Sequence, residues 1–313
     1  MSSRCIKTKD QNGTMHHFLR LQIILLLAAS VFALSSCHKF EGDQTVPAYL
    51  RIDTVLFTTD YVTQGSNTHN ITDAWVYVND QLIGVYELPA TFPVLASGKQ
   101  DLEIRPGIKL NGIGATRAPY PFYKPYVIDG FNFIEDSIQI VRPTTSYYDN
   151  LTFAWTEDFE GSGTSLEKTT ASDTTIDKTS PADHPDAWLS PYSSFSGKVQ
   201  LDAAHEVFQI ASFLSYELPD QGKAVLLEFD YKCDREFGVG MIANLSSSTL
   251  MLPLVIVNKS ETWNKIYINL GPNVSAYTSA QNFKIYFESD RGDQDEANFY
   301  FDNIKVIYRN ISK

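Results

Sequence analysis

The sequence has little cysteine, with three residues in 313. Cys5 and Cys37 lie within or at the end of the N-terminal region, which leaves Cys233 alone in the rest of the chain. A lone cysteine has no intramolecular disulfide partner, so the fold must be held by its hydrophobic cores. Cys233 ends the alternating segment Leu226–Cys233. We therefore expect a buried structural thiol there.

Basic residues are also scarce. Lys and Arg number 25 against 37 Asp and Glu, which gives a formal net charge of −12 at pH 7. Such a chain lacks the cationic surface that binding to phosphate backbones requires. Nucleic acid is therefore excluded as a partner.

Catalytic motifs are missing as well. The sequence contains no Gly-x-Ser-x-Gly elbow, no His-Glu-x-x-His pair and no phosphate-binding glycine loop. The six histidines include no pair at metal-ligand spacing. We predict a protein that is not an enzyme, although paired carboxylates for glycoside hydrolysis stay open at the level of sequence.

One long apolar run is present, Leu21–Leu34, and it follows the basic residues Arg4, Lys7, Lys9 and Arg20. As a helix the run would reach about 21 Å, short of the ~30 Å hydrocarbon core of a bilayer. A basic segment followed by a short apolar run is typical of a secretory signal peptide.

The sequence Leu34-Ser35-Ser36-Cys37 closes this run and resembles the bacterial lipobox. The resemblance implies that residues 1–36 are a lipoprotein signal peptide, removed before Cys37, whose thiol is diacylated. Acyl chains would then anchor the protein, since each buried methylene contributes about 0.8 kcal/mol. An ordinary signal peptide that happens to end near a cysteine is the alternative.

Residues 37–46 form a short polar segment that we interpret as a lipidated tether. Glu41 and Asp43 follow the cysteine closely. They resemble the surface-export signal of lipoproteins of the Bacteroidota, which implies an outer-membrane protein facing the cell exterior. A merely solvated linker is the alternative.

The remaining chain has the pattern of β-strands. In residues 47–143 the alternating segments Trp75–Val78 and Leu82–Tyr86 flank Asn79-Asp80-Gln81, which predicts a hairpin. Short strands with frequent turns indicate a small sandwich. The segment resembles immunoglobulin-like and PEGA-like bacterial domains, a likeness of fold that implies no activity.

We expect residues 144–156 to be a linker and residues 157–313 to be a second sandwich. Three segments, Glu157–Gly161, Trp263–Leu270 and Phe301–Val306, resemble the jelly roll of carbohydrate-binding modules. The predicted fold class is therefore all-β, with two β-sandwich domains, immunoglobulin-like and then jelly roll, after a lipoprotein signal peptide.

The jelly-roll resemblance also implies one possible cofactor, a structural calcium ion. Glu160 in the opening motif and Asp302 in the closing motif would be its carboxylate ligands. Calcium takes six to eight oxygen ligands and can join two carboxylates that are distant in sequence but adjacent in the sheet. Alternatively, Glu160 is a turn residue and Asp302 caps a bulge. No other cofactor is predicted.

A run of aromatic and proline residues suggests a docking surface for a protein partner. Prolines keep the backbone extended, and aromatic rings on such a rod are typical interface anchors. The residues concerned are Pro119, Tyr120, Pro121, Phe122, Tyr123 and Tyr126. The alternative is a proline-rich loop that packs across the end of its domain.

Other candidates are single side chains. Trp188 and Tyr192 would stack on sugar rings if exposed and would be core residues if buried. Thr54 and Thr174 lie in triplets that resemble the O-glycosylation pattern of the Bacteroidota.

These observations favour a non-catalytic, surface-exposed outer-membrane lipoprotein. Its partners would be the outer membrane, through the acyl chains on Cys37, and an outer-membrane assembly or export complex, of which it would be an accessory subunit through protein contacts. The alternative function is a glycan-binding surface lipoprotein with a carbohydrate-binding jelly roll.

Overall fold

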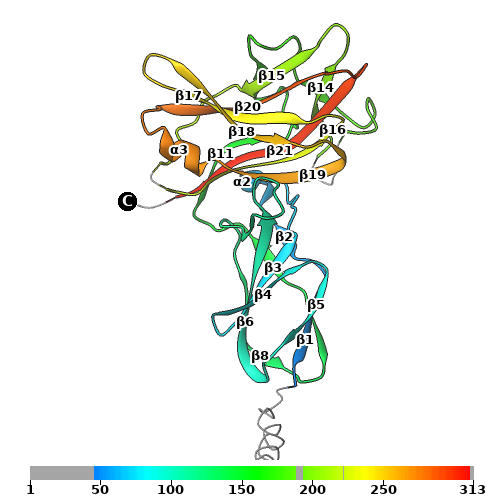
Figure 1. Ribbon diagram of the computed structural model, residues 1–313, viewed down its shortest axis with the longest axis vertical. Coiled ribbons are helices and arrows are strands. Elements are labelled where there is room, and N and C mark those ends of the chain that lie inside the picture. Colours follow the sequence, from blue (N-terminus) through cyan, green and yellow to red (C-terminus); the bar gives the residue numbers. More distant parts are fainter. Residues whose placement is uncertain (1–45, 188–192, 221, 311–313) are drawn as a thin grey trace, which may run out of the picture. The chain divides into compact units, whose positions relative to one another are not determined.

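A computed structural model describes residues 46–187, 193–220 and 222–310 (Figure 1). In this part of the chain almost all regular structure is β-strand, which confirms the all-β sandwich class. The helices described are α2 (Tyr61–Gln64) and α3 (Gly271–Ala276). Neither has the length and hydropathy of a membrane span. The predicted signal peptide, the tether and Cys37 lie outside the described residues.

Ten strands precede residue 147. They are β1 (Ala48–Ile52), β2 (Leu56–Thr58), β3 (Asp73–Val78), β4 (Gln81–Glu87), β5 (Ala90–Val94), β6 (Gly98–Lys109), β7 (Arg117–Pro119), β8 (Tyr126–Phe133), β9 (Ile138–Val141) and β10 (Thr144–Ser146). A sheet of order β5-β1-β9 and a sheet of order β4-β3-β6-β7, with β8 added on β6, enclose one apolar core. The strands β2 and β10 pair separately.

The predicted hairpin is confirmed in β3 and β4. Asn79 and Asp80 link the strands, and both have positive φ, 47° and 63°. A two-residue turn with both central residues in the left-handed region matches the twist of the flanking strands, and Asn and Asp tolerate that conformation best among non-glycine residues. Local turn chemistry therefore determines this register.

Eleven strands follow. They are β11 (Leu151–Glu157), β12 (Leu166–Lys168), β13 (Asp177–Thr179), β14 (Ser196–Leu201), β15 (Val207–Ser212), β16 (Val225–Cys233), β17 (Phe237–Asn244), β18 (Thr249–Val257), β19 (Ser260–Asn269), β20 (Asn282–Asp290) and β21 (Ala297–Arg309). One sheet has the order β13-β14-β21-β16-β19, with β11 also on β21, and is called the β21 sheet below. The other has the order β12-β15-β20-β17-β18 and is called the β20 sheet.

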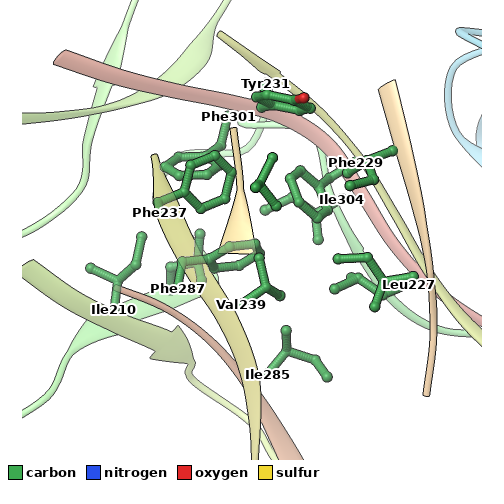
Figure 2. Close-up of a cluster of buried hydrophobic side chains, with 14 of the residues drawn as sticks. Ile210, Leu227, Phe229, Tyr231, Phe237, Val239, Ile285, Phe287, Phe301 and Ile304 are labelled. Carbon is green, nitrogen blue, oxygen red and sulfur yellow. The ribbon is translucent and has the colours of Figure 1, made fainter. Parts of the chain in front are cut away.

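The core between these two sheets is rich in phenylalanine (Figure 2). Phe229 of β16 packs edge-to-face on Phe287 of β20, with ring centroids 5.2 Å apart. Phe237 of β17 makes a similar contact with Phe301 of β21 at 5.2 Å. Alternating apolar residues on each strand supply these rings, so burial of one face per strand holds the sandwich together.

A β-bulge divides β21 into two halves. Odd-numbered residues face the core before the bulge, and even-numbered residues face it afterwards. Asn303 has φ 51°, and the β16–β21 register shifts between Glu228 and Asp230. Before the bulge Phe301 faces the core, and after it Ile304 faces the core. The extra residue of a bulge reverses the alternation of side chains. Ile304 and Val306 therefore face the core, and Lys305 lies on the outer face.

Residues 144–156, which we predict to be a linker between two domains, contain regular strands. Its first three residues form β10, which pairs with β2, and most of the remainder is β11, which pairs with β21. The segment bridges two sets of sheets and is hydrogen-bonded at both ends. These ladder bonds depend on partners distant in sequence, so the composition of the segment does not reveal them.

Cys233 is buried, with 2% of its surface exposed. Burial raises the pKa of its thiol to about 11. A thiol that stays protonated and is shielded from solvent is a poor nucleophile. The prediction of a structural cysteine is confirmed.

Candidate functional site

The outer face of the β21 sheet is covered along one half by residues that precede residue 148. Tyr120, Phe122 and Tyr147 pack there against Tyr267 of β19 and Ile307 of β21, in a third apolar cluster. The rings of Tyr120 and Tyr267 lie 5.0 Å apart. This half of the sheet is therefore an interior surface.

The predicted docking surface is corrected by this arrangement. Tyr120, Phe122 and Tyr123 are 2%, 0% and 3% exposed, so their rings cannot meet a partner. Pro119 and Tyr126 are half-buried, and Pro121 alone of the six residues is exposed. The physical reason is that the rings of Tyr120, Phe122 and Tyr123 offer more apolar area than this segment can leave in water, and they bury it against the β21 sheet.

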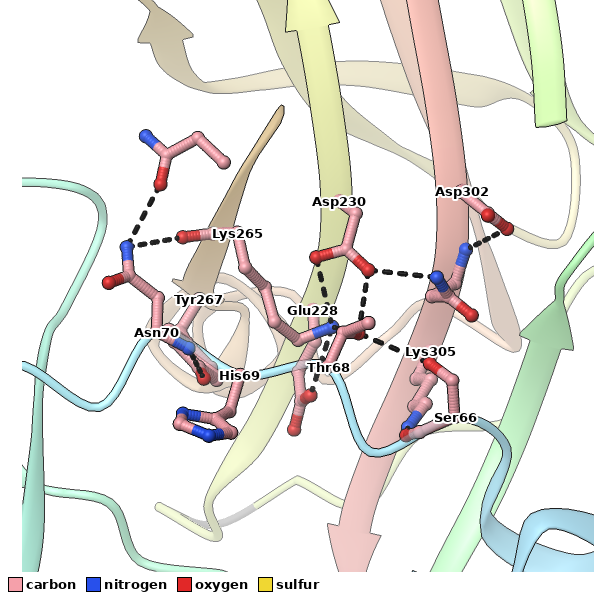
Figure 3. A network of polar contacts seen from close by, with 12 residues as sticks. Ser66, Thr68, His69, Asn70, Glu228, Asp230, Lys265, Tyr267, Asp302 and Lys305 are labelled. Carbon is pink, nitrogen blue, oxygen red and sulfur yellow. Dashed lines mark hydrogen bonds and ion pairs between the residues drawn. The ribbon is translucent and has the colours of Figure 1, made fainter. Parts of the chain in front are cut away.

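A buried polar network lies beside this cluster (Figure 3). Glu228 of β16 is fully buried and accepts hydrogen bonds from the hydroxyls of Tyr120 and Tyr147. The Nζ of Lys265 lies 3.8 Å from a carboxylate oxygen of both Glu228 and Asp230. Every charge in the group has a partner of opposite sign or a polar donor, as burial requires.

The segment Ser66–Asn70 also contacts this network (Figure 3). Lys305 donates a 2.7 Å hydrogen bond to the carbonyl of Ser66, and Thr68 donates a 2.6 Å bond to Asp230. Burial is the main cause that lowers the pKa of Lys305, to about 7, and the nearby charge of Lys265 acts in the same direction. The network thus binds a loop of the first half of the chain to the β21 sheet.

The other half of the outer face is covered by Ser180–Ala187. The indole Nε1 of Trp263 donates a 2.9 Å hydrogen bond to the carbonyl of Asp186, whose carboxylate pairs with Lys232 at 2.5 Å. His184 lies against Lys198 of β14. The β21 sheet therefore offers no broad open face for a ligand in the part of the chain that the structure describes.

The two predicted calcium ligands, Glu160 and Asp302, already accept hydrogen bonds from the turn Ser193–Phe195. A carboxylate oxygen of Glu160 accepts hydrogen bonds from the backbone N–H groups of Ser194 and Phe195, at 2.5 and 2.9 Å. Asp302 accepts a 2.7 Å bond from the hydroxyl of Ser193, and burial raises the pKa of its carboxyl well above the usual value. Within the described ranges no group of three or more acidic, histidine or cysteine side chains is placed to hold a metal ion. These contacts do not favour calcium, which stays a prediction.

The remaining predicted residues are single positions. Thr54 is exposed between β1 and β2, and Thr174 is half-buried in the loop before β13. Trp188 and Tyr192 lie outside the described residues. Of these four residues the structure therefore describes only the two threonines, and their glycosylation stays a prediction.

The β20 sheet presents a different surface. Phe208, Phe237 and Phe287 face the core, so their strand neighbours Gln209, Gly238 and Glu288 face outward. In the register Glu288 of β20 lies opposite Gln209 on one side and opposite Gly238 on the other. The three residues form one row across β15, β20 and β17.

A cavity of about 470 Å³ opens over this row. The amide of Gln209 donates a 2.8 Å hydrogen bond to Glu288 Oε2 and accepts a 2.6 Å bond from Thr169. Arg235 pairs with Asp290 at 2.9 Å on the rim, and Ile256 of β18, which is 76% exposed, supplies an apolar wall. The volume lies within the range of about 300–1,000 Å³ that is usual for small-molecule sites.

Gly238 keeps the floor of this cavity open. A Cβ at this position would lie 3.2 Å from the Cγ of Glu288 and 3.4 Å from its Oε1. With glycine there, Glu288 Oε1 keeps room beside it and has no hydrogen-bond partner among the described residues. The site thus combines planar amide, carboxylate and guanidinium groups with an apolar wall.

Sequence reasoning missed this site. The alternation in Phe283–Glu288 is typical of a strand, yet Gln209, Arg235 and Glu288 look like ordinary surface residues in the sequence. The signal that could have found them is the position of Gln209 opposite Glu288, with Gly238 on the other side of Glu288. Recognising that signal requires knowing the strand register. Register between strands about 80 residues apart is a tertiary property.

Comparison with known proteins gives neither a matching family model nor a match among curated proteins. Among solved structures, the CBM22-1 xylan-binding domain from Paenibacillus barcinonensis Xyn10C is 12% identical and covers 51% of this chain and 97% of its own, with a TM-score of 0.35. The family 11 carbohydrate-binding module from Clostridium thermocellum, in complex with a β-1,3-1,4-mixed-linked tetrasaccharide, is 16% identical, covers 48% and 92%, and has a TM-score of 0.29. The K3 cleaved adhesin domain of Lys-gingipain from Porphyromonas gingivalis is 15% identical, covers 50% and 98%, and has a TM-score of 0.35. Likeness at this level carries no information about the ligand of this chain.

Proposed function

We propose that this chain is a non-catalytic binding protein that holds a glycan in the cavity on the outer face of the β20 sheet. The observation that carries the proposal is the row of Gln209, Glu288 and Gly238 under that cavity, with Arg235 at its rim. Amide and carboxylate groups form paired hydrogen bonds with neighbouring hydroxyls, and an aliphatic wall accepts the C–H face of a sugar ring. A polyhydroxylated ligand uses both features.

The burial of the aromatic and proline segment supports glycan binding over an accessory role in a membrane complex. That role rested on the aromatic and proline segment around Tyr120, whose rings are buried. The cavity over Glu288, in contrast, is open and lined by half-buried polar side chains. Glycan binding is therefore the function that we place first.

The test is binding of the purified chain to an array of neutral and acidic polysaccharides, followed by affinity electrophoresis on each glycan that binds. We expect Glu288→Ala to weaken binding by roughly 10- to 100-fold, because hydrogen bonds to a charged group contribute about 1.5–3 kcal/mol. Gln209→Ala should weaken binding of the same glycan. Glu167→Ala is the matched control. Glu167 lies on β12, its carboxylate is 2.6 Å from the Nζ of Lys284, and it does not line the cavity.

Two results would contradict the proposal. Binding to no glycan in the array would remove the function. Binding that is equally strong in Glu288→Ala and in wild type would remove the site, provided that the variant melts at the wild-type temperature.

We further propose that the protein is an outer-membrane lipoprotein facing the cell exterior, anchored by acyl chains on Cys37. The lipobox-like sequence before Cys37 and the acidic residues after it support this placement. Radiolabelled palmitate should enter the wild-type protein and should not enter Cys37→Ser, which should leave the envelope fraction. Labelling of the variant, or its retention on envelopes, would disprove the anchor.

A further inference from the structure

A second cavity, of about 220 Å³, lies at the edge of the β21 sheet beside β13 and β14. Lys198, Gln200 and Thr179 line it from the two strands, and His184 lines it from the segment that covers the sheet. The calcium and glycan sites discussed above do not involve these residues. Its small volume suits one sugar residue or a smaller group.

Lys198 is a buried cation that lacks an anionic partner. It is 7% exposed, and its Nζ lies 3.0 Å from Gln200 Oε1 and 3.3 Å from His184 Nδ1. No carboxylate among the described residues comes within ion-pair distance of it, whereas the nearby Lys232 pairs with Asp186 at 2.5 Å. A buried ammonium group without a direct ion pair is costly. Burial lowers the pKa of Lys198, and the more distant charges of Glu296, Asp186 and Asp234 offset this only in part.

Two buried hydroxyls next to Lys198 also lack partners. Thr179 is 5% exposed and Ser196 is fully buried, and neither side-chain oxygen has a hydrogen-bond partner in the described part of the chain. In the β13–β14 register Thr179 lies opposite Ser196, and Asp177 lies opposite Lys198. Residues two apart on a strand share a face, so the ammonium and the hydroxyl of Thr179 point to the same side of the sheet.

We propose that this cavity binds a singly charged oxyanion, a carboxylate or a sulfate ester, with Lys198 as its counter-charge and Thr179 as a hydrogen-bond donor. Such a group supplies the missing negative charge and the missing acceptor together. Asp177 and Asp183 are exposed at the same cavity. Their charges disfavour a doubly charged phosphate and leave acceptors for hydroxyl groups.

The oxyanion could be free in solution or could belong to an acidic sugar. The second source rests on the proposed glycan-binding function, and the first does not. Acceptors at Asp177 and Asp183 favour a sugar acid, because a simple anion carries no hydroxyls to donate to them.

The experiment measures ligand-observed NMR saturation transfer on the full mature chain with three probes: sodium acetate, sodium glucuronate and glucose. We expect glucuronate to bind and glucose not to bind. Lys198→Met should abolish binding, and Lys198→Arg should retain it. Thr179→Val should weaken it by roughly 10- to 100-fold, the effect of one hydrogen bond to a charged group. Lys259→Met removes one exposed positive charge away from the cavity and should change nothing.

The outcomes separate the two sources. Acetate bound as tightly as glucuronate supports a free anion, and glucuronate bound alone supports a sugar acid. Binding of neither acidic probe, or binding that survives in a Lys198→Met variant of unchanged melting temperature, overturns the inference. Failure of the glycan-binding proposal is distinguishable, because that proposal is tested by neutral and acidic polysaccharides and by Glu288→Ala.

Discussion

Glu228→Ala is expected to destabilise the protein by about 3–5 kcal/mol, the usual cost of removing one partner from a buried charged network. The side chain is 0% exposed. Its carboxylate accepts hydrogen bonds from Tyr120 and from Tyr147, the latter at 2.9 and 3.0 Å, and faces Lys265 at 3.8 Å. Alanine would leave two buried hydroxyls unpaired and would remove one of the two carboxylates beside the ammonium.

Urea denaturation followed by tryptophan fluorescence measures this loss. Glu228→Gln keeps one acceptor oxygen in the same place while removing the charge, so a smaller loss is expected. Glu167→Ala, which removes a partly exposed pair with Lys284, should cost no more than about 1 kcal/mol. An Ala variant of Glu228 as stable as wild type would show that the network does not bind the two halves of the described chain together.

Raising the pH from 7 to 9 is expected to stabilise wild type relative to Lys305→Met. The folded-state pKa of Lys305 is lowered from 10.5 to about 7. Between these two values the unfolded chain binds a proton at this position that the folded chain does not bind. Folding stability therefore rises with pH across the window and is flat below pH 7, where both states are protonated.

The expected gain is on the order of 3 kcal/mol over two pH units, since one pKa unit corresponds to about 1.36 kcal/mol. The groups that act on Lys305 are Lys265 of β19, Glu228 and Asp230 of β16, and Asp158 after β11. Burial raises the pKa of Tyr120 and of Tyr147, so neither folded tyrosine titrates in this window. Their unfolded-state titration is common to both proteins and cancels in the difference.

Denaturation midpoints of the two proteins at half-unit pH steps give this curve. The contradicting result is a difference in unfolding free energy between wild type and Lys305→Met that stays constant from pH 6 to pH 9. That result would mean that Lys305 has an ordinary pKa and is more accessible to water than its 1% exposure indicates. A variant that is more stable than wild type at pH 7 is compatible with the prediction, because the test is the slope.

Strand positions were the most predictable part of the fold. The alternation in Trp75–Val78 and in Phe283–Glu288 follows from which side of each strand meets the core, and the Asn79-Asp80 turn follows from backbone sterics. Both are properties of short stretches of chain. The reversal of facing in β21, in contrast, depends on the bulge at Asn303 and on the register with β16.

The docking segment shows where sequence reasoning fails. Its prolines and aromatic rings have the same composition whether they face water or a sheet. Their burial depends on Glu228, Tyr267 and Ile307, which lie more than 80 residues later in the chain. No local pattern contains that contact.

Alternating hydrophobicity, turn residues and the absence of disulfide partners determined, from the sequence by itself, an all-β protein with sandwich cores and a structural thiol at Cys233. Tertiary structure alone decided which sheet faces are covered, which charges are buried together and which polar residues line a cavity. The reason is that strand period assigns a side chain to one of two faces, whereas the neighbour of that face is chosen by pairing between distant strands. Glu288 and Lys198 lie in cavities because of such pairing between distant strands.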